Sequence, residues 1–147
     1  AYYNYEPMLF EITLLDVFSP DEETELLEQY LLENNITTEP EESGLYYIET
    51  EVGTGVQPQQ GDTVDVRYTG RLIDSIIFDT STGGDPFSFT LGEGYVIPGW
   101  DEGIAYMKEG GKATLIIPSV LGYGSSGKNS IPPYSTLIFD VDLIDVR

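Results

Sequence analysis

Apolar and polar residues alternate along much of the chain after residue 45, and this period of two is typical of strands that bury one face. The alternating segments, in chain order, are residues 45–51, 63–73, 76–79, 87–91, 112–118 and 136–146. Residues 99–107 differ, because Trp100, Ile104 and Met107 recur there at helical spacing. The pattern predicts an α+β fold, in which an antiparallel half-barrel sheet of five to six strands accompanies one short helix.

The first part of the chain has a different character. It is rich in acidic residues and contains no glycine, whereas all 16 glycines lie from Gly44 onward. The sequence Ser19-Pro20-Asp21-Glu22 combines an N-cap serine, a proline at the first helical position and a glutamate three residues after the cap. We therefore expect an acidic N-terminal extension over residues 1–43, with a helix at about 20–34, and a compact domain over residues 44–147.

The predicted helix has one apolar face, formed by Leu26, Leu27, Tyr30 and Leu31. Such a face has to be covered by the domain, by a partner or by a second copy of the chain, and the sequence leaves these three open. We expect either a monomer or a weak dimer that forms through the N-terminal segment.

Composition excludes several kinds of chemistry. The chain has neither cysteine nor histidine, so disulfides, thiol nucleophiles, Cys/His zinc sites and Ser-His-Asp triads are ruled out. Carboxylates are plentiful, but no pair stands out as the site of a two-acid hydrolase. Six Lys and Arg against 26 Asp and Glu give a formal net charge of -20, which makes nucleic acid a poor partner. We expect no metal and no cofactor.

Aromatic residues at strand positions and loop edges exceed what so small a sheet needs for its core. They are Tyr68, Phe78, Phe87, Phe89, Trp100, Tyr123 and Phe139. Each alone is more consistent with core packing than with a site, but together they could line a concave apolar ligand site.

Several motifs contain these residues and follow one another across residues 45–147. They are Val66-Arg67-Tyr68-Thr69-Gly70-Arg71-Leu72, Phe78-Asp79, Pro86-Phe87-Ser88-Phe89-Thr90-Leu91-Gly92, Val96-Ile97-Pro98-Gly99-Trp100-Asp101-Glu102-Gly103, Tyr123-Gly124 and the segment from Ile131-Pro132-Pro133 to Phe139-Asp140-Val141. In this order and spacing the chain resembles the FKBP-type peptidyl-prolyl isomerases, the macrolide-binding immunophilins. The segment Leu32–Pro40 is also similar to exported bacterial members that carry a helical N-terminal extension.

The resemblance implies an FKBP-like fold that catalyses cis–trans rotation about X-Pro bonds. The barrier to this rotation is about 18–20 kcal/mol, and no covalent bond breaks, so neither metal nor cofactor is needed. The resemblance implies that the catalytic residues are Tyr68, Asp79, Tyr123 and Phe139. It implies that the substrate-binding residues are Phe78, Phe87, Val96, Ile97, Trp100 and Ile131. In this scheme Trp100 forms the floor under the prolyl ring, and Asp79 accepts a hydrogen bond from Tyr68.

Two features leave the function open, namely a missing arginine and the acidic N-terminal extension. Residues 80–86 contain no arginine, although family members often place there a cation that pairs with the carboxylate equivalent to Asp79. An FKBP-fold binding or chaperone module with little or no turnover is therefore the alternative, and a domain whose pocket is blocked by the N-terminal segment is a third.

The resemblance also suggests partners and a location. Proline-containing polypeptides are the implied substrates, and macrolide inhibitors are candidate ligands. The implied location is the bacterial cell envelope or periplasm, reached by export, with a lipid anchor at a removed N-terminus as one form of it. A cytoplasmic location stays open.

Overall fold

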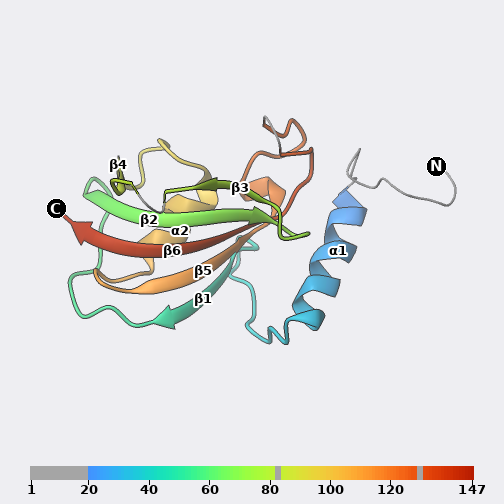
Figure 1. Cartoon of the computed structure of the whole chain (residues 1–147), viewed down its shortest axis with the longest axis horizontal. Coiled ribbons are helices and arrows are strands. Elements are labelled where there is room, and N and C mark those ends of the chain that lie inside the picture. Colours follow the sequence, from blue (N-terminus) through green and yellow to red (C-terminus); the bar gives the residue numbers. More distant parts are fainter. Residues whose placement is uncertain (1–19, 82–83, 129–130) are drawn as a thin grey trace, which may run out of the picture.

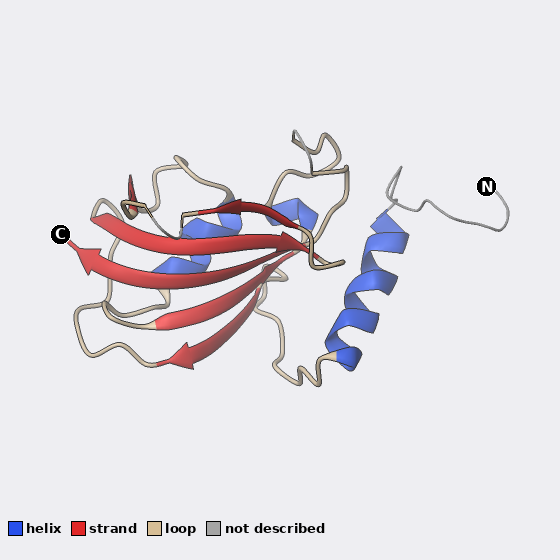
Figure 2. Cartoon of the chain, viewed as in Figure 1, coloured by secondary structure: helices blue, strands red, loops and turns tan. Residues whose placement is uncertain are grey.

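The computed structural model describes residues 20–81, 84–128 and 131–147, and its elements follow the order shown in Figures 1 and 2. These elements are α1 (Pro20–Glu33), β1 (Tyr46–Glu51), β2 (Thr63–Leu72), β3 (Ile77–Thr80), β4 (Phe87–Thr90), α2 (Pro98–Ala105), β5 (Lys112–Ile117), the 3₁₀ helix η2 (Ser119–Leu121) and β6 (Leu137–Val146). The strands predicted from alternation are confirmed, and the ends that differ do so by one residue.

The strands form one six-stranded antiparallel sheet in the order β1-β5-β6-β2-β3, and β4 pairs with β2 off this path. The two longest strands, β2 and β6, lie side by side at its centre. Along β6 the apolar residues at odd positions from Leu137 to Leu143 are buried, whereas Asp140 is exposed. A curved sheet with one buried face explains this alternation.

Helix α2 packs on the buried face of the sheet (Figure 2), and two glycines bring it close. A Cβ atom on Gly99 would lie 2.6 Å from Cγ2 of Ile117, and one on Gly103 would lie 2.7 Å from Cδ2 of Leu115. Because these glycines carry no side chain, the helix backbone can lie directly against β5. This contact brings the intervening Trp100 into the core, where it is only 4% exposed.

Helix α1 lies beside the end of the sheet where β6 begins (Figure 1) and not over either sheet face. The helix predicted at about 20–34 is confirmed with the bounds Pro20–Glu33. It ends where Asn35 adopts a left-handed conformation with φ 55°, as helix ends often do. Ser19, the predicted cap, lies outside the described residues. Leu26 and Leu27 are half-buried, whereas Leu32 is 79% exposed.

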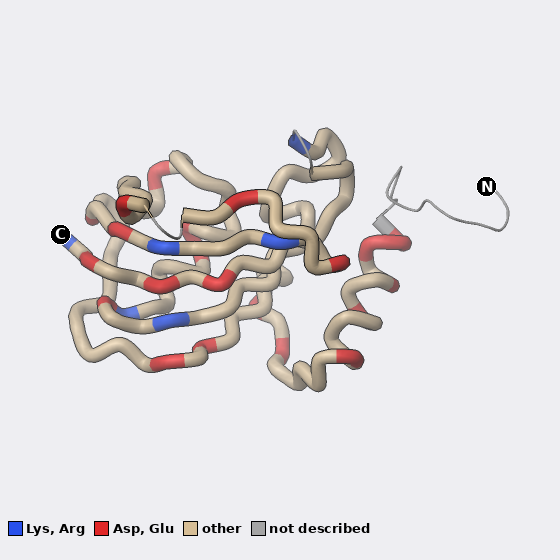
Figure 3. Tube along the Cα trace, in the orientation of Figure 1, with Lys and Arg blue, Asp and Glu red and all other residues tan. Residues whose placement is uncertain are grey.

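Acidic side chains are spread over α1, the strands and the loops, whereas cations are few (Figure 3). Within the described ranges the structure contains three salt bridges, which are Arg71–Asp140, Arg147–Asp65 and Arg147–Asp145. No helix in these ranges is long and apolar enough to cross a bilayer.

Candidate functional site

The indole of Trp100 on α2 is surrounded by a cluster of aromatic rings from three strands. Its ring centroid lies 4.8 Å from that of Tyr68 on β2, 5.2 Å from Phe139 on β6, and 5.9 Å and 6.0 Å from Phe89 and Phe87 on β4. Most of these pairs meet edge to face, which is the preferred aromatic geometry. Residues that are distant in sequence therefore meet around one ring.

The cluster is graded from a buried floor to an exposed rim. Trp100 and Phe139 are each 4% exposed, whereas Phe87 is 40% exposed. Phe78, at 5.5 Å from Phe139, is half-buried, as is Tyr68. The Trp100 Nε1 is buried with no hydrogen-bond partner among the described residues, so its N–H is a donor that these residues leave unused.

The remaining residues that the resemblance implies lie in two connecting segments. Val96 and Ile97 directly precede α2 and pack half-buried against the core. Ile131, which is 7% exposed, and the half-buried Tyr123 lie between η2 and β6. Tyr123 is near enough to Tyr68 for their hydroxyl groups to interact electrostatically. The structure thus places these residues in or against the same hydrophobic core as Trp100, while their roles stay a proposal.

Tyr68 and Asp79 form a direct hydrogen bond, in which the Tyr68 hydroxyl donates to Oδ2 of Asp79 at 2.7 Å. Burial, followed by this hydrogen bond and the carboxylate charge, raises the pKa of Tyr68 well above its usual range. Asp79 itself is exposed. No Lys or Arg in the described part of the chain forms a salt bridge with it, and Arg67 instead donates to the Gly84 carbonyl at 2.6 Å.

Gly70 shapes the site, although sequence reasoning did not include it among the site residues. A Cβ atom there would lie 2.5 Å from Cε1 of Phe139 and 2.8 Å from Cζ of Phe78. Only a glycine lets both rings approach the β2 backbone. The available signal was a glycine inside an otherwise regular strand, which often marks a close approach.

The segment before α2 is held by a carboxylate of that helix. Asp101 accepts hydrogen bonds from the backbone N–H groups of Gly92 at 2.8 Å and Gly94 at 3.2 Å. The Ile97 carbonyl accepts the N–H of Trp100 at 3.0 Å and starts the helix. Within the described residues the Ile97 N–H donates to no protein acceptor, so it is available to a ligand carbonyl.

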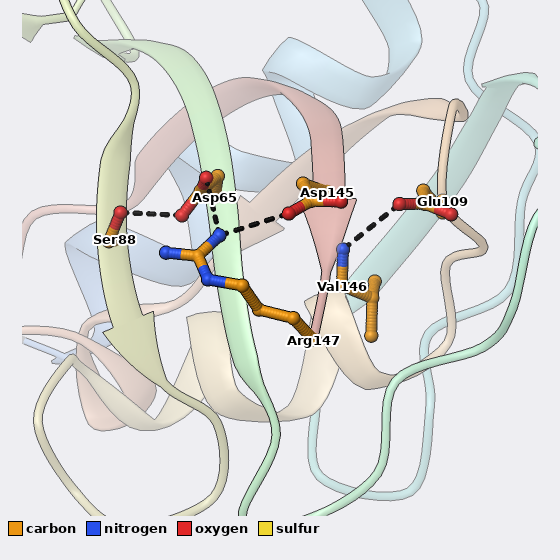
Figure 4. A network of polar contacts seen from close by, with 6 residues as sticks. All are labelled: Asp65, Ser88, Glu109, Asp145, Val146 and Arg147. Carbon is orange, nitrogen blue, oxygen red and sulfur yellow. Dashed lines mark hydrogen bonds and ion pairs between the residues drawn. The ribbon is translucent and has the colours of Figure 1, made fainter.

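A polar network at the C-terminus fixes the strand that presents Phe87 (Figure 4). Arg147 donates to Asp65 at 2.7 Å and to Asp145 at 3.0 Å, and Ser88 donates to Asp65 at 2.5 Å. The hydrogen bonds from Arg147 and then Ser88 lower the pKa of Asp65. This contribution to stability is therefore present above the ordinary aspartate pKa and is lost as the pH falls through the lowered value.

Potential metal ligands do not gather in this structure. No group of three or more Asp or Glu side chains in the described ranges could hold an ion. What the site offers instead is an apolar floor, a tyrosine–carboxylate pair and one available backbone donor.

Comparison with known proteins agrees with this arrangement. The family model described as FKBP-type peptidyl-prolyl cis-trans isomerase matches residues 54–144, which is more than half of the chain. The chain belongs to the FKBP-type peptidyl-prolyl cis-trans isomerase family. The family resemblance seen in the sequence is thereby confirmed.

Bacterial members of the FKBP family are among the similar proteins. The FKBP-type peptidyl-prolyl cis-trans isomerase FkpA of Escherichia coli K12 is 48% identical over 124 residues, which cover 84% of this chain and 44% of the relative. The probable FkpA of Neisseria meningitidis is 49% identical over 106 residues, which cover 71% of this chain and 38% of the relative. The chain thus spans less than half the length of these relatives.

Solved structures give the same fold. The crystal structure of FkpA from Escherichia coli has a TM-score of 0.77 and 45% identity, and the match covers 86% of this chain and 60% of that one. The crystal structure of a peptidyl-prolyl cis-trans isomerase from Pseudomonas syringae has a TM-score of 0.74 and 32% identity, and the match covers 88% of this chain and 96% of that one. The predicted half-barrel with one short helix and an N-terminal helix is confirmed as an FKBP fold.

Proposed function

We propose that this chain catalyses cis–trans isomerisation of the peptide bond before proline in polypeptide substrates. The observation that carries the proposal is the convergence of aromatic rings on the buried indole of Trp100, next to the Tyr68–Asp79 hydrogen bond. A buried apolar floor suits the prolyl ring, and family membership supports the reaction.

In the proposed mechanism the prolyl ring lies on Trp100, with Phe87, Phe139 and other apolar side chains as walls. The Ile97 N–H and the Tyr123 hydroxyl each hold a substrate carbonyl. The twisted amide is less dipolar than the planar one, so a water-poor apolar site disfavours the planar ground state more than the transition state. The Asp79 carboxylate, which the Tyr68 hydroxyl holds in place, acts on the carbonyl of the rotating bond.

A binding or chaperone module with little turnover is the second candidate. One observation favours it, namely that no cation in the described residues forms a salt bridge with the Asp79 carboxylate. Such a module would bind proline-containing peptides through the same rings without lowering the rotation barrier.

An isomerisation assay with a short X-Pro peptide separates the two candidates. At micromolar protein we expect the cis-to-trans rate to exceed the buffer rate clearly, and a macrolide of the FK506 type to suppress the gain. A rate equal to that in buffer, together with measurable peptide binding, would select the binding module and reject the enzyme.

The pH dependence of the activity follows from the titrating groups. The chain has no histidine, and burial together with Asp79 raises the pKa of Tyr68, so its hydroxyl stays protonated where free tyrosine ionises. We expect kcat/KM to stay constant within about twofold from about pH 6 to about pH 10. The stability from this shift is fully present below the ordinary tyrosine pKa and is lost as the pH rises toward the raised value. A bell-shaped profile centred near neutral pH would contradict this assignment.

Removal of the Tyr68 hydroxyl tests the tyrosine–carboxylate pair. Tyr68→Phe keeps the ring beside Trp100 but frees Asp79 to rotate, so we expect kcat/KM to fall about three- to tenfold, which corresponds to one hydrogen bond. Tyr47→Phe is the matched control, because Tyr47 also donates to a carboxylate, that of Glu49, but lies on β1 outside the cluster. Equal activities of the two variants would remove Tyr68 from the mechanism.

We also propose that residues 44–147 form the isomerase domain and that residues 1–43 form an extension. The exposed Leu32 on α1 supports weak dimerisation through this extension. Sedimentation of the wild-type chain and of Leu32→Glu tests the dimer. We expect the wild-type chain to dimerise weakly and Leu32→Glu to be monomeric, and equal sedimentation of the two would reject an interface at Leu32.

We propose a location in the bacterial cell envelope, because the bacterial FkpA proteins are among its relatives. A lipid anchor is a finer form of the same proposal. Fractionation of cells that make the full-length natural protein tests both, and recovery in the cytoplasm alone would reject them.

A further inference from the structure

Helix α1 contacts the rest of the protein through the carboxylate of Glu23. Its Oε2 accepts hydrogen bonds from the backbone N–H of Ser119 at 2.7 Å and from the Thr136 hydroxyl at 2.9 Å. Its Oε1 accepts one from the Ser119 hydroxyl at 2.6 Å. Ser119 and Thr136 are 5% and 4% exposed. Among the described residues, these two are the ones with polar side chains that are buried. Both buried hydroxyls therefore depend on one carboxylate that comes from the N-terminal helix.

The two partners of Glu23 flank the loop that carries Tyr123, whose hydroxyl holds a substrate carbonyl in the proposed mechanism, and the implied substrate-binding residue Ile131. Ser119 precedes Tyr123 by four residues, and Thr136 follows Ile131 by five. The Ser119 carbonyl also accepts the N–H groups of Gly122 and Gly124, which are the neighbours of Tyr123. A displacement of Ser119 therefore moves the turn that presents Tyr123.

Tyr30 of α1 also interacts with Arg71 on β2. Burial acts to lower the pKa of Arg71, but hydrogen bonds to Asp140 and to Tyr30 of α1 outweigh it and raise the pKa. Tyr30 lies seven residues after Glu23, which places both on one face of the helix. Glu23 and Tyr30 thus join α1 to the domain, and the helix lies beside the end of the sheet where β6 begins (Figure 1).

We propose that Glu23 is a positioning residue for Tyr123 and Ile131, which lie in the described segments 122–128 and 131–133 between η2 and β6. Its carboxylate joins the two ends of the loop, so that Tyr123 and Ile131 keep their places beside the Trp100 cluster. Hydrogen bonds to an ionised acceptor are stronger than neutral ones, and loss of the acceptor leaves buried donors without a partner. The inference rests on the proposed isomerase function and adds the N-terminal helix to the substrate site.

The variant Glu23→Ala, compared with Glu28→Ala, tests the proposal in the full chain. Glu28 is an exposed residue of the same helix. Because Tyr123 binds substrate in both the ground and transition states, we expect KM of a proline peptide to rise about fivefold or more in Glu23→Ala. We expect kcat to change by less than about twofold, since Trp100 and Asp79 lie on other elements. General destabilisation would instead lower the active fraction, and so apparent kcat, at unchanged KM.

Glu23→Gln separates hydrogen-bond geometry from charge. The amide oxygen can accept from the Ser119 N–H and the Thr136 hydroxyl, while the amide NH₂ donates to the Ser119 hydroxyl, which turns to accept. We expect this variant to restore KM to nearly the wild-type value. Thr136→Val has the same shape but lacks one donor, and we expect it to raise KM by less than Glu23→Ala does.

Hydrogen exchange gives a readout that does not depend on catalysis. The amides of Gly122 and Gly124 should exchange faster in Glu23→Ala than in Glu28→Ala. If the wild-type chain lacks isomerase activity, the proposed function fails alone, and peptide affinity and these exchange rates still test the positioning role. Peptide affinity and exchange in Glu23→Ala equal to those of the Glu28→Ala control would overturn the proposal. If Glu23→Ala does not fold, the KM values of Glu23→Gln and Thr136→Val are compared instead. A higher KM in Thr136→Val would support the proposal, and equal KM values would overturn it.

Discussion

Replacement of Phe139 by alanine is expected to reduce kcat/KM by about 100-fold or more, because the ring walls the proposed site beside Trp100. The Phe139 ring also packs at 5.5 Å from Phe78 and 6.0 Å from Tyr68, so its loss leaves a hollow at the floor of the cluster. Truncation of a buried phenylalanine costs about 3–5 kcal/mol of unfolding free energy. Peptide isomerisation by the folded fraction, with urea denaturation alongside, measures both effects.

Leu143→Ala is the matched control for Phe139→Ala. Leu143 is fully buried on the same strand and the same face, but four residues further along β6, which is roughly 13 Å away. We expect a comparable loss of stability, about 2–5 kcal/mol, with nearly unchanged activity of the folded fraction. If both variants lose activity in proportion to stability alone, Phe139 is only a core residue.

Gly70→Ala is expected to impair the site through crowding. The added methyl group would lie 2.5 Å from the Phe139 ring and 2.8 Å from the Phe78 ring, so both rings must move. Overpacking of this kind costs about 1–3 kcal/mol, and displaced site residues should lower kcat/KM about tenfold or more. Urea denaturation measures the loss of stability, and the peptide assay measures the fall in kcat/KM.

Gly84→Ala serves as the control for Gly70→Ala. A Cβ atom on Gly84 meets no atom within 4 Å, so we expect this variant to keep both stability and activity. Unchanged kcat/KM in Gly70→Ala would mean that Phe78 and Phe139 need no fixed position for turnover.

The sheet could be predicted from the sequence because each strand buries one face, so that the chemistry of the side chains repeats with period two. β6 shows this most clearly, since Asp140 interrupts an otherwise buried segment and is exposed. The short helix could be predicted because Trp100 and Ile104 share one face. The pairing of β4 with β2, off the main strand order, depends on contacts that no local pattern contains.

The site was predictable only in part. The motifs pointed to Tyr68 and Asp79, but nothing in the sequence indicated that the Asp79 carboxylate would be exposed. The role of Gly70 depends on two rings from other strands. The Glu23 contacts join residues 96 and 113 positions apart, so they follow from the docking of α1 and not from any spacing along the chain.

Nuclear Overhauser contacts between a bound proline peptide and Trp100, the single tryptophan, show whether the prolyl ring lies on the indole. We expect contacts from the prolyl ring protons to the indole of Trp100 and to the ring of Phe139, in a sample where the peptide exchanges between cis and trans faster than in buffer. Contacts confined to another surface, or faster exchange with no contact to Trp100, would contradict this expectation.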